Sequence, residues 1–528
     1  MKLILLLGAA TADYVRMPVD RRALSPTSNT FTRLFPKLER FAASIDDNTL
    51  RSKVIAIGVA GGIMDAGDFG VHPNINNLEN PTMSVGYTTF GQFLDHDITF
   101  DARSVINANA DPLNTLNFRT TAFDLDSVYG SGPVNSPQFY TNSSKYIKFI
   151  VPQMKGSAAV SRKGFQRYDV PRTSNLRAII ADPRNDEHIT LNQLQLAFLK
   201  FHNAVTDIIV ADPAYKSILS DPYKVFYYAK QTVIWHYQYI IVHEFLPKTV
   251  GQSVVDDILK NGLKYYDPRT NPAFKKNIGN GRYMASLPIE FSSAAYRFGH
   301  SQVRPSYTIN FGTTSELNMI LFDDTIPLST IDPNDMRGGT IGARRFIDWQ
   351  TFFTFPPNLQ SGVVPTHNMA IDTKISSPLF HLPKSVPAAG NCNGPQIPPG
   401  LPCDGVQSLA SRNLARQVNY DIPSGQDIAA AMGLTGITVT PLQKYGLDKS
   451  SPLWFYCLYE AQTLKSGQQL GPVCGRIVAE VFFGLLYFDQ SSYLVKNPSF
   501  VPNLKSITPG TFTIPDLLIL ANVVTPLS

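Results

Sequence analysis

Hydrophobic side chains recur along most of this chain at the three- and four-residue spacing of an α-helix. Residues 191–210 are the clearest case, because their apolar positions fall on one helix face: Leu194, Phe198, Phe201, Val205 and Ile208. The same spacing predicts helices over 223–245, 454–464 and 477–486, the first of them ending at Pro247 because proline interrupts a helix. Strand-like alternation is rare and short, as in 306–309. The pattern predicts a mainly α protein.

Loops and domain organisation follow from the polar stretches between these segments. Residues 103–118 and 378–405 are rich in Asn, Pro and Gly and are expected to form long ordered loops. A chain of 528 residues is long enough for two or three domains, yet no Gly/Ser-rich or charged linker divides it. We therefore expect one large domain over 51–528, preceded by an N-terminal arm over 1–50.

The composition indicates a globular protein and argues against nucleic-acid binding and membrane-spanning helices. Hydrophobic residues make up 43% of the chain and charged residues 16%, against about 25% charged in an average protein, which indicates a large buried core. The net charge is +5, and no run of basic residues exceeds a pair, so nucleic acid is not an expected partner. No apolar stretch approaches the ~18 residues that a membrane-spanning helix needs, and we expect no such helix.

The N-terminus and the cysteines bear on localisation without deciding it. Residues 1–12 combine a charged start, an apolar run and an Ala-Thr-Ala pattern, which suggests either a short secretory signal or an ordinary terminal helix or strand. Asn142 begins a glycosylation sequon, so secretion is our expectation and the cytoplasm the alternative. A disulfide could close the Pro-rich loop between Cys392 and Cys403, while buried free thiols are equally natural in the apolar stretches that hold Cys457 and Cys474.

Two histidine elements are candidates for chemistry. In Leu94-Asp95-His96-Asp97, a histidine stands between two carboxylates on an apolar segment, where buried ionisable groups need partners. In 296–300, Gly299 precedes His300, and a small residue there lets a flat group approach the backbone, as an axial haem ligand requires. Taken alone, each histidine is better explained as a hydrogen-bonded core residue.

Two further segments carry clustered oxygen and charge. Residues 182–187 form an acidic turn before the helix expected at 191, which by itself indicates an N-terminal helix cap. Residues 120–130 hold oxygen-bearing groups at alternating positions, which can converge on a hard cation such as Ca²⁺ or simply line a polar surface.

Together these elements resemble the animal haem peroxidase family, also called the peroxidase–cyclooxygenase superfamily. The resemblance rests on 94–97, 182–187, 296–300 and 412–416 and extends over roughly residues 85–490. It implies one haem peroxidase domain with a helical core around the haem. The absence of an evident appended module and the replaced segment 417–421 make the chain look more like microbial or invertebrate members than mammalian ones.

The resemblance also implies a role for each site residue. His96 matches the distal base, Arg184 the distal arginine, and Gln92 a residue lining the distal cavity. His300 matches the proximal iron ligand, with Asn413 accepting a hydrogen bond from its far ring nitrogen. Two arginines match the partners of the haem propionates and two carboxylates match positions that become ester-linked to haem b: Arg297 and Arg416, and Asp95 and Glu187.

A calcium site is implied beside the distal histidine. Its ligands would be the carboxylates of Asp97, Asp124 and Asp126, the hydroxyl and carbonyl of Thr120, and the carbonyl of Ala122. Six or more oxygen ligands suit Ca²⁺ better than Mg²⁺ or Zn²⁺.

The activity implied is peroxidase chemistry, in which H₂O₂ oxidises a small electron donor (halide, thiocyanate or phenolic) through an oxo-iron intermediate. One alternative is a fatty-acid dioxygenase, whose radical tyrosine lies three residues before the proximal histidine. That position is Arg297 here, and Tyr296 is one residue away, so its side chain is turned by about 100°. The other alternative is a non-catalytic, haem-containing adhesion or matrix protein.

Overall fold

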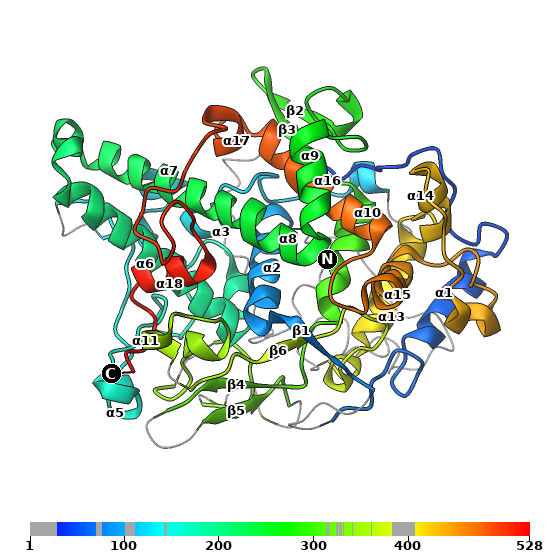
Figure 1. The fold of residues 1–528 in the computed structure, drawn as a ribbon, viewed down its shortest axis with the longest axis horizontal. Helices are drawn as coiled ribbons and strands as arrows, with labels where there is room; N and C mark the ends of the chain where they lie inside the picture. The colour runs from blue at the N-terminus through cyan, green and yellow to red at the C-terminus, as the bar shows by residue number, and fades with distance from the viewer. Residues whose placement is uncertain are drawn as a thin grey trace.

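The computed structural model describes residues 29–69, 76–100, 111–141, 145–312, 316–323, 326, 330, 332–339, 342–360, 362–382 and 407–527. The signal-like residues 1–12, the sequon at Asn142, and Cys392 and Cys403 lie outside these ranges. Helices dominate the described chain (Figure 1), which confirms the predicted fold class. No helix among the described residues is long and apolar enough to cross a membrane.

The helices are α1 Asp47–Ile57, α2 Val85–Ile98, α3 Asp126–Tyr129, α4 Gly132–Asn135, α5 Ser157–Val160, α6 Ile189–Ala211, α7 Pro222–Ile240, α8 Leu246–Val250, α9 Gln252–Asn261, α10 Ile289–Ser292, α11 Pro357–Gln360, α13 Leu409–Asn419, α14 Gly425–Ala431, α15 Leu453–Lys465, α16 Pro472–Phe488, α17 Tyr493–Lys496 and α18 Ile514–Leu520. Three 3₁₀ segments matter below: η4 Pro183–Asp186, η5 Pro213–Ile218 and η8 Ala295–His300. In the described part, the strands form three two-stranded antiparallel sheets: β1 Glu79–Ser84 with β6 His367–Met369, β2 Lys275–Gly279 with β3 Arg282–Ala285, and β4 Ser306–Asn310 with β5 Leu317–Ile320.

The predicted helices over 191–210, 454–464 and 477–486 fall inside α6, α15 and α16, and the strand over 306–309 falls inside β4. α2 runs through the middle of the molecule, with α6 and α7 on one side and α13 and α15 towards the opposite end (Figure 1). A connected hydrophobic core extends from Phe31 to Val524. The described end of the expected N-terminal arm is therefore part of the core.

The prediction that the helix over 223–245 ends at Pro247 is wrong. α7 continues through a π turn, Ile241–Phe245, directly into α8, and Pro247 lies in the first turn of α8. Proline is tolerated in a first helical turn because its missing N–H has no intrahelical partner there, and the wider π turn makes room for its ring. The chain turns away only at Gly251, whose φ of 92° suits a residue without a side chain.

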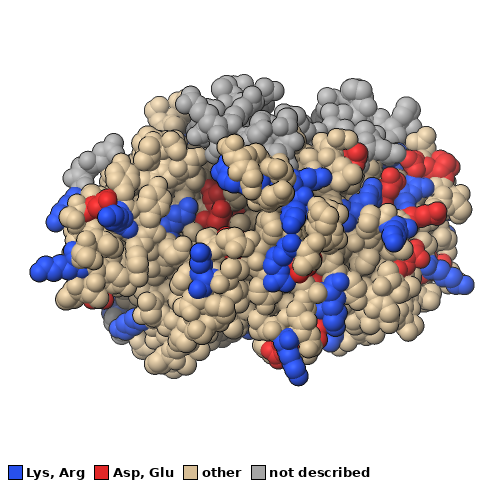
Figure 2. Space-filling view, turned by 90° about the horizontal axis from the view of Figure 1, so that it is seen from above, with Lys and Arg blue, Asp and Glu red and all other residues tan. Residues whose placement is uncertain are grey.

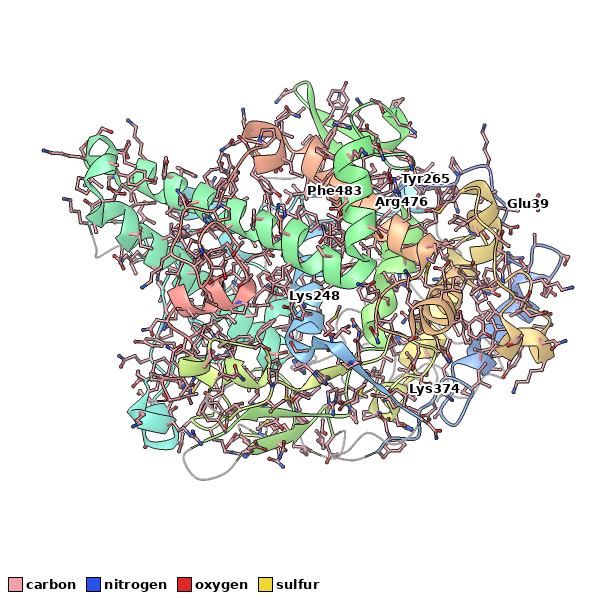
Figure 3. The ribbon with its side chains drawn as sticks, in the orientation of Figure 1. Glu39, Lys248, Tyr265, Lys374, Arg476 and Phe483 are labelled. Atoms are coloured by element: carbon pink, nitrogen blue, oxygen red, sulfur yellow. A yellow bond between two sulfur atoms is a disulfide. The ribbon has the colours of Figure 1, made fainter. Side chains whose placement is uncertain are left out.

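α15 and α16 are joined by a disulfide between Cys457 and Cys474, with 5.5 Å between the Cα atoms. α16 is further held to α9 through Arg476, labelled in Figure 3, which pairs with Asp257 and donates from Nε to Glu480 at 2.8 Å. On the surface seen in Figure 2, Lys and Arg are scattered among Asp and Glu rather than gathered in one patch.

Candidate functional site

His96 lies in the last turn of α2 and is fully buried. Its Nδ1 is 2.8 Å from Oδ1 of Asn185, and the Nδ2 of Asn185 donates to Gln195 at 2.9 Å. The asparagine therefore presents its oxygen to the ring, so Nδ1 carries the proton and Nε2 keeps a free lone pair. Nε2 has no hydrogen-bond partner among the described residues, and burial together with Arg184 lowers the pKa of His96 to about 3. A neutral imidazole with an unused basic nitrogen can accept a proton.

Arg184 is held beside His96 by a buried carboxylate. Its Nε and Nη2 donate to the two oxygens of Asp182 at 3.0 and 2.7 Å, and Nη2 also donates to the His96 carbonyl at 2.9 Å. Burial alone would raise the pKa of Asp182, but the guanidiniums of Arg119 and Arg184 hold that pKa well below its usual value. The Nη1 of Arg184 has no hydrogen-bond partner among the described residues. One rigidly held cationic donor is thus left for a further group.

Two carboxyl groups complete this side of the site. Glu187 is buried, and neither of its side-chain oxygens has a hydrogen-bond partner among the described residues. Burial raises the pKa of Glu187 well above its usual value, against the opposing charge of Arg184. Burial likewise raises the pKa of Asp95, opposed by Arg184 and Arg297. Uncompensated polar atoms in a protein interior are costly, which indicates that another group belongs here.

His300 ends η8 and faces Asn413 of α13. Its Nδ1 is 2.7 Å from the Nδ2 of Asn413, while Arg297 donates from Nη1 to the Oδ1 of Asn413 at 3.1 Å. The direction of the bond to His300 is therefore opposite to the one expected. A guanidinium can only donate, so it takes the amide oxygen and leaves the amide N–H₂ to the imidazole. Trp454 of α15 supports η8 by donating to the Arg297 carbonyl at 3.1 Å.

Three buried arginines lie near one another, and the first of them shares Asn413 with His300: Arg297, Arg412 and Arg416. Burial, then the charges of Arg416 and Arg297, lowers the pKa of Arg412 to about 9. Repulsion among buried cations of this kind is relieved by an anion, such as the carboxylates of a haem. The sequence interpretation gave no role to Arg412, although its spacing of four from Arg416 puts both on one face of α13.

Asp97, Asp124 and Asp126 form an acidic cluster beside His96, and their oxygens lie within 4.8 Å of one another. Leu125 N and Tyr237 Oη donate to Asp97 at 3.1 Å each, and Ser127 Oγ donates at 2.9 Å. Thr120 Oγ1 donates to Asp124 at 2.8 Å, and Ala122 lies in the same loop. Burial and the neighbouring carboxylates raise the pKa of Asp97 well above its usual value and that of Asp124 to about 7. A cation would compensate this cluster.

The structure thus brings the predicted residues into three connected groups. His96 and Arg184 share one group, His300, Asn413 and Arg297 a second, and the three aspartates a third. Gln92 lies on α2 one turn before His96 and is half-buried. The distal and proximal elements touch, because Tyr296 of η8 donates to the Gly91 carbonyl of α2 at 3.0 Å. Sequence reasoning missed Asn185 and Tyr237, whose partners lie 89 and 140 residues away along the chain.

Comparisons with known proteins give matches to haem peroxidases. The model of the family described as animal haem peroxidase matches residues 102–331. Heme peroxidase 2 of Caenorhabditis elegans is 27% identical over 129 residues, which is 23% of this chain and 16% of that protein. Thyroid peroxidase of Homo sapiens is 23% identical over 215 residues, 38% of this chain and 20% of that protein. The matched regions thus span a fifth or less of these relatives.

Solved structures extend the likeness of fold to nearly the whole chain. Peroxidase A of Dictyostelium discoideum matches with a TM-score of 0.54 and 15% identity, over 99% of this chain and 98% of that one. A fatty acid alpha-dioxygenase of Oryza sativa, solved with palmitic acid, matches with a TM-score of 0.53 and 13% identity, over 93% of this chain and 83% of that one. At these identities, the likeness shows a shared fold. The family model, which matches less than half of the chain, agrees with the resemblance to animal haem peroxidases that the sequence predicted.

Proposed function

We propose that this protein is a haem peroxidase that uses H₂O₂ to oxidise small electron donors: halide, thiocyanate or phenols. The observation that carries the proposal is the pair of unpartnered buried atoms on the distal side, Nε2 of His96 and Nη1 of Arg184. They are a base and a cationic donor held by the same hydrogen-bond network, which is the combination that heterolysis of a peroxide needs.

The side chains fit a haem b with His300 as the proximal ligand. When bound, the haem iron supplies the redox chemistry that consumes peroxide. His300 would hold the iron through Nε2, and the three arginines would bind the propionates. A propionate that draws Arg297 away from Asn413 would release the amide oxygen. The amide could then reverse and accept the proton of Nδ1, which a metal-bound histidine needs to donate.

On the distal side, His96 would take a proton from H₂O₂ at Nε2 and return it to the departing oxygen. Arg184 would stabilise the negative charge on that oxygen through Nη1. Burial of both groups keeps bulk water from competing for these hydrogen bonds. Asp95 and Glu187, which lie near Arg184, would form the ester links to the haem.

We further propose that the acidic cluster holds Ca²⁺ through Asp97, Thr120, Ala122, Asp124 and Asp126. Support comes from the mutual approach of three carboxylates within 4.8 Å, one from α2 and two from a segment that also offers hydroxyl and carbonyl oxygens. Three carboxylates against two positive charges leave the site only slightly anionic. Because Asp97 follows His96 directly on α2, the ion would also fix the distal histidine.

The fatty-acid dioxygenase is less well supported. The hydroxyl of Tyr296 is bonded to the Gly91 carbonyl, and the residue three positions before His300 is Arg297. No side chain that could form the required radical stands at that position.

The test is turnover of H₂O₂ by haem-loaded protein with bromide, iodide and a phenol as donors. A peroxidase oxidises at least one donor in proportion to peroxide consumed. His243→Gln, an exposed histidine on the π turn, is a matched control and should behave like wild type. Oxygen uptake with linoleate, without donor oxidation, would instead favour the dioxygenase, and bound haem without any turnover would favour a non-catalytic role.

A further inference from the structure

Two tyrosines meet at the tip of the hairpin formed by α6 and α7, at the edge of the molecule in Figure 1. Tyr215 of η5 and Tyr228 of α7 have ring centroids 4.9 Å apart, with an angle of 61° between the rings. Each ring stands on a capped element. Asp212 accepts from Ala214 N at 2.9 Å at the start of η5, and Asp221 accepts from Tyr223 N at 3.0 Å at the start of α7. These caps stabilise the backbone segments that carry the two rings.

The two phenol groups are close to each other and accessible to solvent. The neighbouring Tyr228 hydroxyl raises the pKa of Tyr215 to about 12, so Tyr215 is a phenol at neutral pH. Tyr228 is 46% exposed and Tyr215 is half-buried. With 4.9 Å between the ring centroids, ortho carbons of the two rings lie near each other. Ortho carbons are the atoms through which phenoxyl radicals couple.

We propose that Tyr215 and Tyr228 become joined by an intramolecular dityrosine cross-link when the protein turns over peroxide. The inference rests on the proposed function, which supplies the oxidant. Each phenol loses one electron and its hydroxyl proton, and the two radicals form a carbon–carbon bond between ortho carbons. The two ortho hydrogens then move to the oxygens, which restores both phenols. Overall, two electrons and two protons leave the pair and reduce one H₂O₂ to two waters.

Neighbouring tyrosines show why this pair is singled out. Tyr223 and Tyr227 are 47% and 52% exposed, slightly more than Tyr228. The ring contact of Tyr227 is with Phe226, which offers no phenol for coupling. In the described chain, the other tyrosine–tyrosine ring contact joins Tyr239 and Tyr493 at 6.3 Å, and Tyr493 is buried. Proximity and access coincide at Tyr215 and Tyr228.

The experiment is peptide mapping of haem-loaded protein after treatment with H₂O₂ and a small phenol. We expect a species that joins the peptides of Tyr215 and Tyr228, lighter by two hydrogens than their sum, together with dityrosine fluorescence of the monomer. Tyr215→Phe and Tyr228→Phe should each lose both signals. Tyr227→Phe, an equally exposed tyrosine on the same helix, should keep them.

A second arm separates this inference from the proposed function. The same protein is oxidised by a photoexcited ruthenium complex with persulfate, which needs no haem chemistry from the chain. A cross-link in both arms supports the inference. A cross-link with the external oxidant alone shows that the two tyrosines can couple. It overturns the inference that the protein's own peroxide turnover couples them, and it points to failure of the proposed peroxidase activity. No cross-link in either arm, or joining of Tyr223 or Tyr227 between molecules instead, overturns the assignment of the pair.

Discussion

On both sides of the site, buried charged and polar groups contact the histidine, but only on the proximal side is the segment that carries it also packed against helices joined by a disulfide. The distal groups depend on Asp182, Asn185 and the acidic cluster around Asp97. η8, which carries His300, packs against α15 and α16, and these two helices are tied by the bond between Cys457 and Cys474.

Because of this difference, the distal and proximal sides should lose their geometry under different conditions. Buried charges cost free energy unless they are compensated, so the distal geometry should depend on bound ions. Metal removal does not weaken apolar packing or a disulfide. The proximal geometry should therefore depend on whether Cys457 and Cys474 are oxidised.

The largest expected effect comes from the distal base. His96→Ala should retain haem and slow the reaction with H₂O₂ by roughly 10²- to 10⁴-fold, because the proton transfer loses its acid and base. Stopped-flow absorption of haem-loaded protein after mixing with peroxide measures the rate. His243→Gln serves as the control, and an unchanged rate in His96→Ala would remove His96 from this role.

Metal removal comes next. If Ca²⁺ binds the acidic cluster, an ion present at a thousand times its Kd stabilises the fold by about 4 kcal/mol. Chelation or Asp124→Asn should therefore lower the melting temperature and reduce peroxide turnover together, because Asp97 no longer holds α2 in place. Metal analysis should find one calcium per chain before chelation. Asp256→Asn, an exposed carboxylate on α9, should change neither property.

Full activity after complete removal of the metal would contradict the proposed link between the cation and His96. An absence of calcium from the purified protein would contradict the site itself.

The disulfide should have a somewhat smaller effect, confined to the proximal side. Cys457 and Cys474 are 17 residues apart, and closing a loop of this length stabilises a fold by roughly 3 kcal/mol. Replacing both cysteines by serine should lower the free energy of unfolding by about this amount and loosen haem binding. Urea unfolding and haem loss to apomyoglobin measure the two effects. Equal haem retention by the variant would show that the disulfide does not support η8.

The smallest effect concerns the ester links, which should hold the haem in the protein without changing the rate of peroxide turnover. After treatment with peroxide, haem should resist extraction by acidic acetone in wild type and become more extractable in Glu187→Gln or Asp95→Asn. Complete extraction from active wild-type protein would refute the covalent links and leave the peroxidase proposal intact.

The helices with strong periodicity could be predicted because their spacing alone decides the buried face, as in α6 and α16. The passage of the helix through Pro247 could not, because the π turn before it depends on how Ile241–Phe245 packs against the rest of the core. The pairing of Cys457 with Cys474 likewise depends on where α15 and α16 lie in space, which spacing along the chain does not determine.

In the candidate site, too, some residues could be predicted from local sequence and others only from the fold. His96, Arg184 and His300 stand in recognisable local motifs, so resemblance was enough to pick them out. Asn185, which orients His96, and Tyr237, which donates to Asp97, are common residue types far away in sequence, and only the fold brings them there. The direction of the bond between Asn413 and His300 in this structure differs from the one expected with haem bound, because Arg297 takes the amide oxygen.

The central claim is that His300 holds a haem opposite His96, and the absorption spectrum of haem-loaded protein tests it most directly. Wild type and His243→Gln should bind one haem per chain and show the Soret band of a histidine-ligated haem. His300→Ala should lose that band, and added imidazole should restore it by filling the space of the missing ligand, which separates loss of the ligand from misfolding. An unaltered Soret band in His300→Ala without imidazole would contradict the account.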